Sequence, residues 1–476
     1  MNLTLARWRS QLLAGVVLGA YGFAIALAPG FTAKGVLCAP LLAVPLIWWL
    51  LADTSHWLIA FFVAAWLLPP LPVTLGNSGP HVSLLFAGFG VWMGLACLRS
   101  WRFRLDGAAL PIVLVLATLC LSLSMALLYS GPAIAELSAV RVLLFAISVY
   151  VYFFVRSGLV PLEMPRLVRI LFWTGAASAL FACVDFYYQF PAPAGYGPQF
   201  IWLASGVFRR AQGFFYEAST LGNLCAFFLV LIAVSFVRAF NIRERFRPQA
   251  VSTLVLGGCL FSAALVLSYS RGSLINVLVA CAALAVLQFS SIRFARVLPA
   301  AAILTIAGAL MLALVAPEFA QAYWARAVAS VQYFFESPNA VMSGRLRTWE
   351  ILIGFLQSHP LYALLGVGYK TLPYSDFIGA TAIADNAYLS ALIETGIGGL
   401  AALLVLNGAI LRSSYIAARS DAPLRSLLGT WMFCFWCGQS VQMFTGDLLT
   451  YWRVLPAYFC ILALAENDAN PVRRPI

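Results

Sequence analysis

The chain has 476 residues, of which 63% are hydrophobic and only 10% are charged, and its mean hydropathy is +0.92. A soluble protein of this length needs far more charge on its surface, so the composition excludes a soluble enzyme and predicts a polytopic membrane protein. The formal net charge is +12, but many of the arginines stand in short loops between apolar segments, where they set topology, so nucleic-acid binding is not expected.

Most of the apolar segments have the roughly 17 to 25 residues that a membrane-spanning helix needs, which favours helices over a β-barrel. We expect one all-α membrane domain over residues 1–476, with about fourteen spans and both termini in the cytoplasm. The spans are predicted at residues 11–28, 35–51, 56–71, 81–98, 108–128, 139–155, 167–186, 217–237, 250–268, 273–289, 297–316, 387–411, 426–444 and 448–465. The first is kept as a span and not as a cleaved signal peptide, because Pro29 directly follows the A-x-A pattern of Ala26 and Ala28.

The predicted loops fall into two kinds. The inner loops are marked by arginines, as the positive-inside bias requires. These are Arg99, Arg102, Arg104, Arg156, Arg166, Arg169, the RERFR run at 243–247, Arg293, Arg296, Arg412, Arg419, Arg473 and Arg474. Two outer loops are long, residues 187–216 and residues 317–386, the latter between the eleventh and twelfth spans.

The 317–386 loop is expected to contain an amphipathic helix. An apolar stripe begins after Gly344 and recurs at helical spacing until Pro360, which closes the helix. Its members are Leu346, Trp349, Ile353 and Leu356. Such a helix lies on the bilayer surface or on the membrane bundle.

A second set of cations lies in the predicted outer segments, where the positive-inside bias gives no reason for them. Apart from Lys34, they are Arg141, Arg209, Arg210, Arg271, Arg326, Arg345, Arg347, Lys370 and Arg453. Arginine clusters suit phosphate, because the planar guanidinium donates a bidentate pair of charge-assisted hydrogen bonds, so a diphosphate ligand would explain them. The alternative is that they reach lipid headgroups or form ion pairs. The acids available for pairing are Glu136, Asp185, Glu217, Glu318, Glu336, Glu350, Asp376 and Asp385.

Cysteine and histidine give no sign of a redox or metal site. The ten cysteines are scattered through apolar segments, so they are expected to be small core residues and not a disulfide framework. His56, His81 and His359 stand apart from one another and predict no metal site.

Several short motifs follow one another in the second half of the chain. They read RAQGFFYEASTLGN at 210–223, SYSRGSLI at 268–275, SGRLRTWE at 343–350, GVGYK at 366–370 and ADNAYLSALIETGIGGL at 384–400. In this order they resemble the O-antigen ligase and polysaccharide polymerase superfamily, the Wzy/WaaL type. The resemblance covers roughly residues 209–400.

The resemblance implies a multi-helix glycosyltransferase of the GT-C type in the bacterial inner membrane, with its active site and its long loop facing the periplasm. Such proteins transfer a glycan from undecaprenyl diphosphate, without a nucleotide sugar, a metal or another cofactor. The polymerases move the growing chain onto the next lipid-linked repeat unit, and the ligases move it onto lipid A core. Membrane lipids surround the protein, and a chain-length regulator is a partner by family analogy alone.

The resemblance also suggests roles for individual residues. Arg210, Arg271 and Arg345 are expected to bind the donor diphosphate and to stabilise the charge that grows on it, with Arg347 and Lys370 assisting.

Two carboxylates are candidates for the general base, Asp385 and Glu217. Helix capping is the open alternative for each, since both directly precede an apolar helical segment. In the ligases the position before Asn386 is typically histidine, whereas here it is Asp385. This change, together with the acidic Glu217 segment, favours a polymerase over a ligase.

Other polar features have simpler expectations. Glu394 lies within the twelfth span and is expected to pair with another helix, and Gly396 with its neighbouring glycines to permit close helix packing. Tyr187, Tyr188, Tyr196 and Trp202 either stack on sugar rings or form an interfacial aromatic belt. A secondary transporter or flippase is the interpretation from another class, and it would place charges at mid-membrane between repeats.

Overall fold

The structure is a computed structural model. It describes residues 15–17, 19–71, 80–158, 164–193, 195–203, 206–239, 250–287, 344–373 and 383–467, together with scattered positions between 320 and 342. Several predicted features lie outside these residues, namely the eleventh span, the start of the first span, the arginines at 243–247, Arg293, Arg296, Arg326, Arg473, Arg474, and parts of the 317–386 loop. The chain divides into two compact units, residues 1–57 and residues 58–476.

The first unit is built around α2 (Gly30–Ala52), an apolar helix that carries Pro40 and Pro45 in its interior. At its end the ring of His56 stacks on Trp49, with ring centroids 4.2 Å apart.

The second unit is a helical bundle. Its helices are α3 (His56–Leu67, which begins at the end of the first unit), α4 (Ser83–Ala96), α5 (Ala109–Ser130), α6 (Pro132–Arg156), α7 (Met164–Tyr188), α8 (Ala218–Ala239), α9 (Val251–Leu267), α10 (Arg271–Leu287), α14 (Arg345–Ser358), α15 (Pro360–Leu365), α16 (Ala387–Ala418), α17 (Pro423–Gln442) and α18 (Leu455–Glu466). Three short 3-10 turns, η1 (Leu98–Ser100), η2 (Gly213–Phe215) and η4 (Leu448–Thr450), lie between them.

Five of the described helices, α5 to α8 and α16, are long and apolar enough to cross a membrane. Together with several shorter apolar helices they make the chain a multi-pass membrane protein. The predicted spans from 56–71 to 273–289 and from 387–411 to 426–444 each coincide with a helix. The last prediction was wrong at its start, because α18 begins at Leu455 and residues 448–450 form η4 instead.

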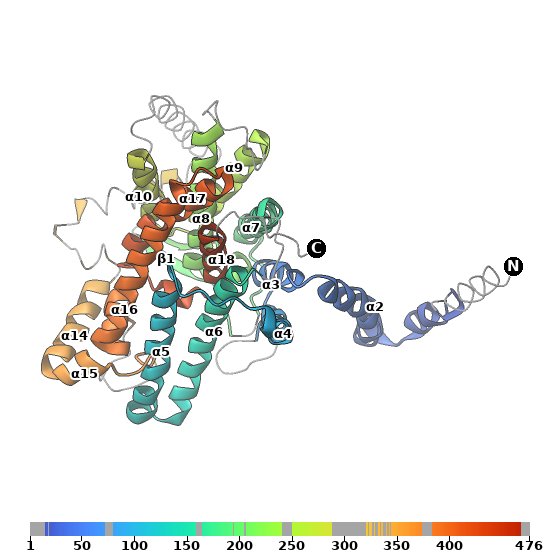
Figure 1. Ribbon diagram of the computed structural model, residues 1–476, viewed down its shortest axis with the longest axis horizontal. Helices are drawn as coiled ribbons and strands as arrows, with labels where there is room; N and C mark the ends of the chain where they lie inside the picture. Colours follow the sequence, from blue (N-terminus) through green and yellow to red (C-terminus); the bar gives the residue numbers. More distant parts are fainter. Residues whose placement is uncertain are drawn as a thin grey trace. The chain divides into compact units, whose positions relative to one another are not determined.

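Within the bundle, α16 and α17 pack along each other (Figure 1). On either side, α5 packs against α16, and α8 and α10 pack against α17. Where α8, α10 and α17 meet, the buried amides of Asn223 and Asn276 both donate to Gln442 Oε1, each at 2.9 Å. Interhelical hydrogen bonds of this kind hold apolar helices in one register.

The last helix, α18, is tied down at both ends. Tyr458 donates to Asn223 Oδ1 of α8 at 2.5 Å, and Glu466 forms a buried ion pair with Arg156 of α6 at 2.8 Å. These contacts fix the segment that precedes α18, residues 448–454.

Gly396 interrupts α16, with a φ of +74° and a ψ of −174°. The break exposes the carbonyls of Ile393 and Glu394, which accept hydrogen bonds from the N–H groups of Val367 (2.9 Å) and Gly368 (3.0 Å). A Cβ on Gly396 would lie 2.2 Å from the carbonyl oxygen of Leu364. The glycine therefore receives the loop at a break in α16. Because Leu364 belongs to α15, the missing Cβ also permits the close helix packing expected from the sequence at this position.

The amphipathic helix predicted after Gly344 is present as α14, and α15 follows it directly at Pro360. Leu352 and Leu356 of α14 are buried against Val367 and against Ile393 of α16. Of the two expected positions, the structure therefore shows α14 on the bundle. In the 187–216 loop, β1 (Phe200–Leu203) and β2 (Gly206–Arg209) form an antiparallel hairpin, which the all-α prediction did not include.

Candidate active site at the helix ends

Three arginines from distant parts of the chain lie together. Arg210 follows β2, Arg271 begins α10 and Arg345 begins α14. Burial lowers the pKa of Arg210, Tyr451 and Glu217 oppose that change, and the nearby charges of Arg345 and Arg271 add to it. Its Nε donates to the carbonyl oxygen of Ser268 at 2.8 Å. We call Arg210, Arg271 and Arg345 the arginine cluster.

Glu217 lies beside the arginine cluster, directly before α8. Its carboxylate accepts a hydrogen bond from the hydroxyl of Thr220 at 2.7 Å. Burial raises the pKa of Glu217, the charges of Arg453 and Arg210 oppose that change, and Asp385 adds to it. The carboxyl group therefore lies among cations but keeps a raised affinity for a proton.

Asp385 completes this group of charges. Its Oδ2 lies 3.2 Å from Nε of Arg345, and its side chain is 49% exposed. The capping alternative for Asp385 was wrong, because the cap of α16 is Asn386, whose side-chain oxygen accepts from the N–H groups of Tyr388 (3.0 Å) and Leu389 (3.1 Å). Asp385 is thus free of a capping role and pairs with an arginine instead.

Strained backbone gathers around the same residues. Among the described residues that are not glycine, five have a positive φ, and four of these are Tyr216, Tyr269, Lys370 and Asp385. Each is a candidate residue or lies within two positions of one. Such conformations cost about 1–2 kcal/mol for a residue with a side chain, and they concentrate at functional sites.

Residues 255–404 match the family model described as O-antigen ligase. The chain carries a domain of the O-antigen ligase and polymerase superfamily. No curated protein matches the chain. The O-antigen ligase domain contains Arg271, Arg345 and Asp385, whereas Arg210 and Glu217 precede it, so the candidate site is assembled from the domain and from the segment before α8.

Lys370, also in the O-antigen ligase domain, lies in a buried ion triad. Its Nζ contacts Oδ2 of Asp447, lies 3.5 Å from Oε2 of Glu394 and donates to Ser390 Oγ at 3.0 Å. Burial acts to lower the pKa of Lys370, but Asp447 and Glu394 outweigh it and raise that pKa. The triad joins the GVGYK loop to α16 and to the segment before η4.

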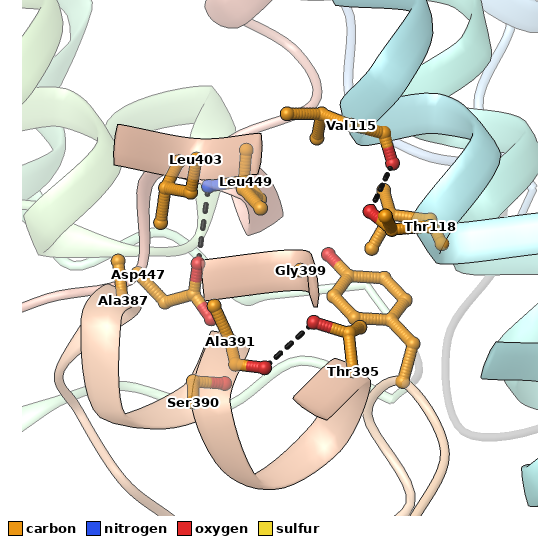
Figure 2. Close-up of a pocket in the computed structure, with 12 residues that line it drawn as sticks. Val115, Thr118, Ala387, Ser390, Ala391, Thr395, Gly399, Leu403, Asp447 and Leu449 are labelled. Carbon is orange, nitrogen blue, oxygen red and sulfur yellow. Dashed lines mark hydrogen bonds between the residues drawn. The ribbon is translucent and has the colours of Figure 1, made fainter. Parts of the chain in front are cut away.

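A small cavity of about 10 Å³ lies against the triad, between α5 and α16. Figure 2 shows Asp447 and Ser390 on one side of it and Val115 and Thr118 of α5 on the other. This volume is about what one water molecule needs.

The remaining predicted cations take different places. Arg347 is exposed on α14. Arg209 lies 3.4 Å from Asp185, so the ion-pair alternative holds for this residue. Among the described residues, no group of three or more His, Cys, Asp or Glu side chains is arranged to hold a metal ion.

Two residues of the site were not predicted. Asp447 binds Lys370, and Tyr451 is buried where its hydroxyl acts on the pKa of Arg210. One feature of the sequence could have indicated Asp447: it is an acidic residue between two apolar segments, where a charge needs a partner.

Proposed function

We propose that this chain is a polysaccharide polymerase of the bacterial inner membrane. It would transfer a glycan from undecaprenyl diphosphate to the next lipid-linked repeat unit at the periplasmic face. The observation that carries the proposal is the meeting of Arg210, Arg271 and Arg345 beside Glu217. Guanidinium groups bind and neutralise phosphate oxygens, and a buried carboxylate beside them supplies a base.

The reaction needs one bond to form and one to break. The hydroxyl oxygen of the acceptor sugar forms a bond to the anomeric carbon of the donor, and the bond from that carbon to the diphosphate oxygen breaks. The electron pair leaves with the diphosphate, where the arginine cluster stabilises the added charge. The hydroxyl proton passes to a carboxylate. One displacement without a covalent intermediate inverts the anomeric centre.

Glu217 is the better base of the two candidate carboxylates. A base works best when its pKa lies near the working pH, and burial raises the pKa of Glu217 in that direction. Asp385 is half exposed and paired with Arg345. We therefore assign Asp385 to holding Arg345 in place, and Glu217 to accepting the proton.

An O-antigen ligase is the second candidate, because the matching family model carries that description. It would use the same arginine cluster and the same leaving group, with lipid A core as the acceptor. Asp385 in place of the histidine typical of the ligases supports the polymerase. A transporter is less well supported, because the clustered charges stand at helix ends and in the segments between helices.

A deletion strain tests the proposal. We expect single repeat units to accumulate on undecaprenyl diphosphate, with long chains restored by the wild-type gene. Arg210→Ala, Arg271→Ala and Arg345→Ala should each fail to restore them while the protein remains in the membrane, whereas the exposed Arg102→Ala should succeed. Full chains left on undecaprenyl diphosphate in the deletion strain would identify a ligase instead. Unchanged surface glycan would contradict both the polymerase and the ligase proposals.

A further inference from the structure

A second cavity is lined in part by Glu217, the carboxylate beside the arginine cluster. Its volume is about 120 Å³, whereas one water needs about 10–15 Å³, so it takes a group the size of a sugar ring. It opens between the loop that precedes α8 and the segment 450–453. Five of its lining side chains are aromatic: Tyr196, Phe215, Tyr216, Tyr451 and Trp452. We call this cavity the aromatic pocket.

Arg453 forms the cationic wall of the aromatic pocket. The residue is only 5% exposed, and within the described part of the chain it forms no ion pair with a carboxylate. Its guanidinium lies over the rings of Phe215 and Trp452, 5.8 and 5.6 Å from their centroids. Burial lowers the pKa of Arg453, and Tyr196, Tyr216 and Glu217 oppose that change. A guanidinium has five N–H donors, so at a cavity wall Arg453 can still donate to a ligand with acceptor oxygens.

The anionic wall is Glu217, which also faces the arginine cluster. Arg453 and Arg210 both act on the pKa of Glu217. Tyr451, which lines the same pocket, acts on the pKa of Arg210. Glu217 is therefore common to both sites, because it lines the aromatic pocket and is within electrostatic range of Arg210.

This combination of walls selects among ligands. Aromatic rings offer a negative face to the C–H bonds of a sugar ring, while charged side chains hydrogen-bond its hydroxyls. A diphosphate fits less well, because most of the lining is aromatic and the negative faces of the rings do not favour an anion, whereas the arginine cluster supplies three guanidinium groups. A neutral polyhydroxylated ring fits both the aromatic faces and the charged side chains.

We propose that the aromatic pocket is the acceptor subsite, in which the accepting sugar stacks on the aromatic side chains and directs a hydroxyl to Glu217. Arg453 binds its neighbouring hydroxyls. This inference rests on the proposed function, since it names where the second substrate of that reaction is held. It also gives the tyrosines of the 187–216 loop a sugar-stacking role through Tyr196.

Binding of a free oligosaccharide tests the pocket without requiring transfer. The probe is the strain's own repeat-unit oligosaccharide, released from its lipid by mild acid, and saturation-transfer NMR measures its binding to the purified full chain in detergent. We expect Trp452→Leu and Tyr196→Leu each to weaken binding about tenfold. Trp92→Leu, a matched change at an exposed tryptophan, should bind as the wild type does.

Two results would overturn the inference. One is wild-type affinity in both Trp452→Leu and Tyr196→Leu, and the other is displacement of the oligosaccharide by inorganic pyrophosphate, which would make the pocket a phosphate site. The deletion strain separates this failure from failure of the proposed function. Loss of long chains in the deletion strain would support the proposed function. If Trp452→Leu and Tyr196→Leu then both restore the long chains with an unchanged KM for the acceptor, only the acceptor subsite is wrong.

Discussion

Replacing Lys370 distinguishes a structural role of this residue in the ion triad from a role in substrate binding. The side chains of Lys370, Glu394 and Asp447 are only 10%, 3% and 11% exposed. Lys370→Met leaves two buried carboxylates without their cation. Breaking a buried ion pair from one side costs about 3–5 kcal/mol, because the remaining charge stays desolvated. We therefore expect the variant to lose a large part of its stability.

Thermal unfolding of the purified full chain in detergent, followed by tryptophan fluorescence, measures this loss. A decrease in Tm on the order of 5 °C or more is expected for Lys370→Met. Adding Glu394→Gln removes one of the stranded charges and should recover part of the decrease. Arg347→Met changes an exposed cation and should shift stability by no more than about 0.5 kcal/mol. If Lys370→Met unfolds at the wild-type temperature but loses activity, Lys370 is a substrate ligand and the structural assignment is wrong.

Three further predictions concern the site and the broken helix. Because burial raises the pKa of Glu217, the activity of the wild type should fall as the pH drops through that pKa and the base takes up a proton. Glu217→Gln should lower kcat about 10²–10⁴-fold and should abolish this acidic limb of the pH profile. Asp385→Asn keeps the Asn386 cap but loses the ion pair with Arg345, so KM for the donor should rise more than kcat falls. If kcat instead falls as much as in Glu217→Gln, Asp385 is the base. Gly396→Ala, at a φ of +74°, should cost at least about 1–2 kcal/mol and speed proteolysis of the GVGYK loop, and wild-type resistance would contradict this.

The parts of the fold that sequence could predict are those that depend on local pattern. Hydrophobic runs located most of the helices, since a helix that meets lipid must be apolar along its whole length. The stripe after Gly344 located α14 for a different reason, since its apolar residues recur at helical spacing on one face. The start of α18 was misplaced, because Leu448 and Leu449 are apolar but belong to a 3-10 turn.

The candidate site was predicted only where motifs marked it. Arg210, Arg271 and Arg345 stood out as outer cations within motifs, and the structure brings them together. The partner of Lys370 could not be found in this way, because Glu394 and Asp447 are far from it in sequence and only the break at Gly396 brings the loop to α16.

The roles of the charged residues also depended on backbone geometry that composition does not encode. Asp385 and Asn386 are equally good capping residues by type, and only the backbone decides that Asn386 caps α16. Arg453 looked like any other outer arginine until its burial among aromatic side chains was known.

If the arginine cluster holds the diphosphate of the donor, the three arginines should determine how tightly the chain binds the lipid diphosphate. The measurement compares the affinity of the purified chain, in nanodiscs of neutral lipid, for undecaprenyl diphosphate and undecaprenyl monophosphate. A charge-assisted hydrogen bond contributes about 1.5–3 kcal/mol, so Arg210→Ala, Arg271→Ala and Arg345→Ala should each weaken diphosphate binding by about tenfold or more and monophosphate binding by less. Unchanged affinity for the diphosphate in all three variants would contradict the account.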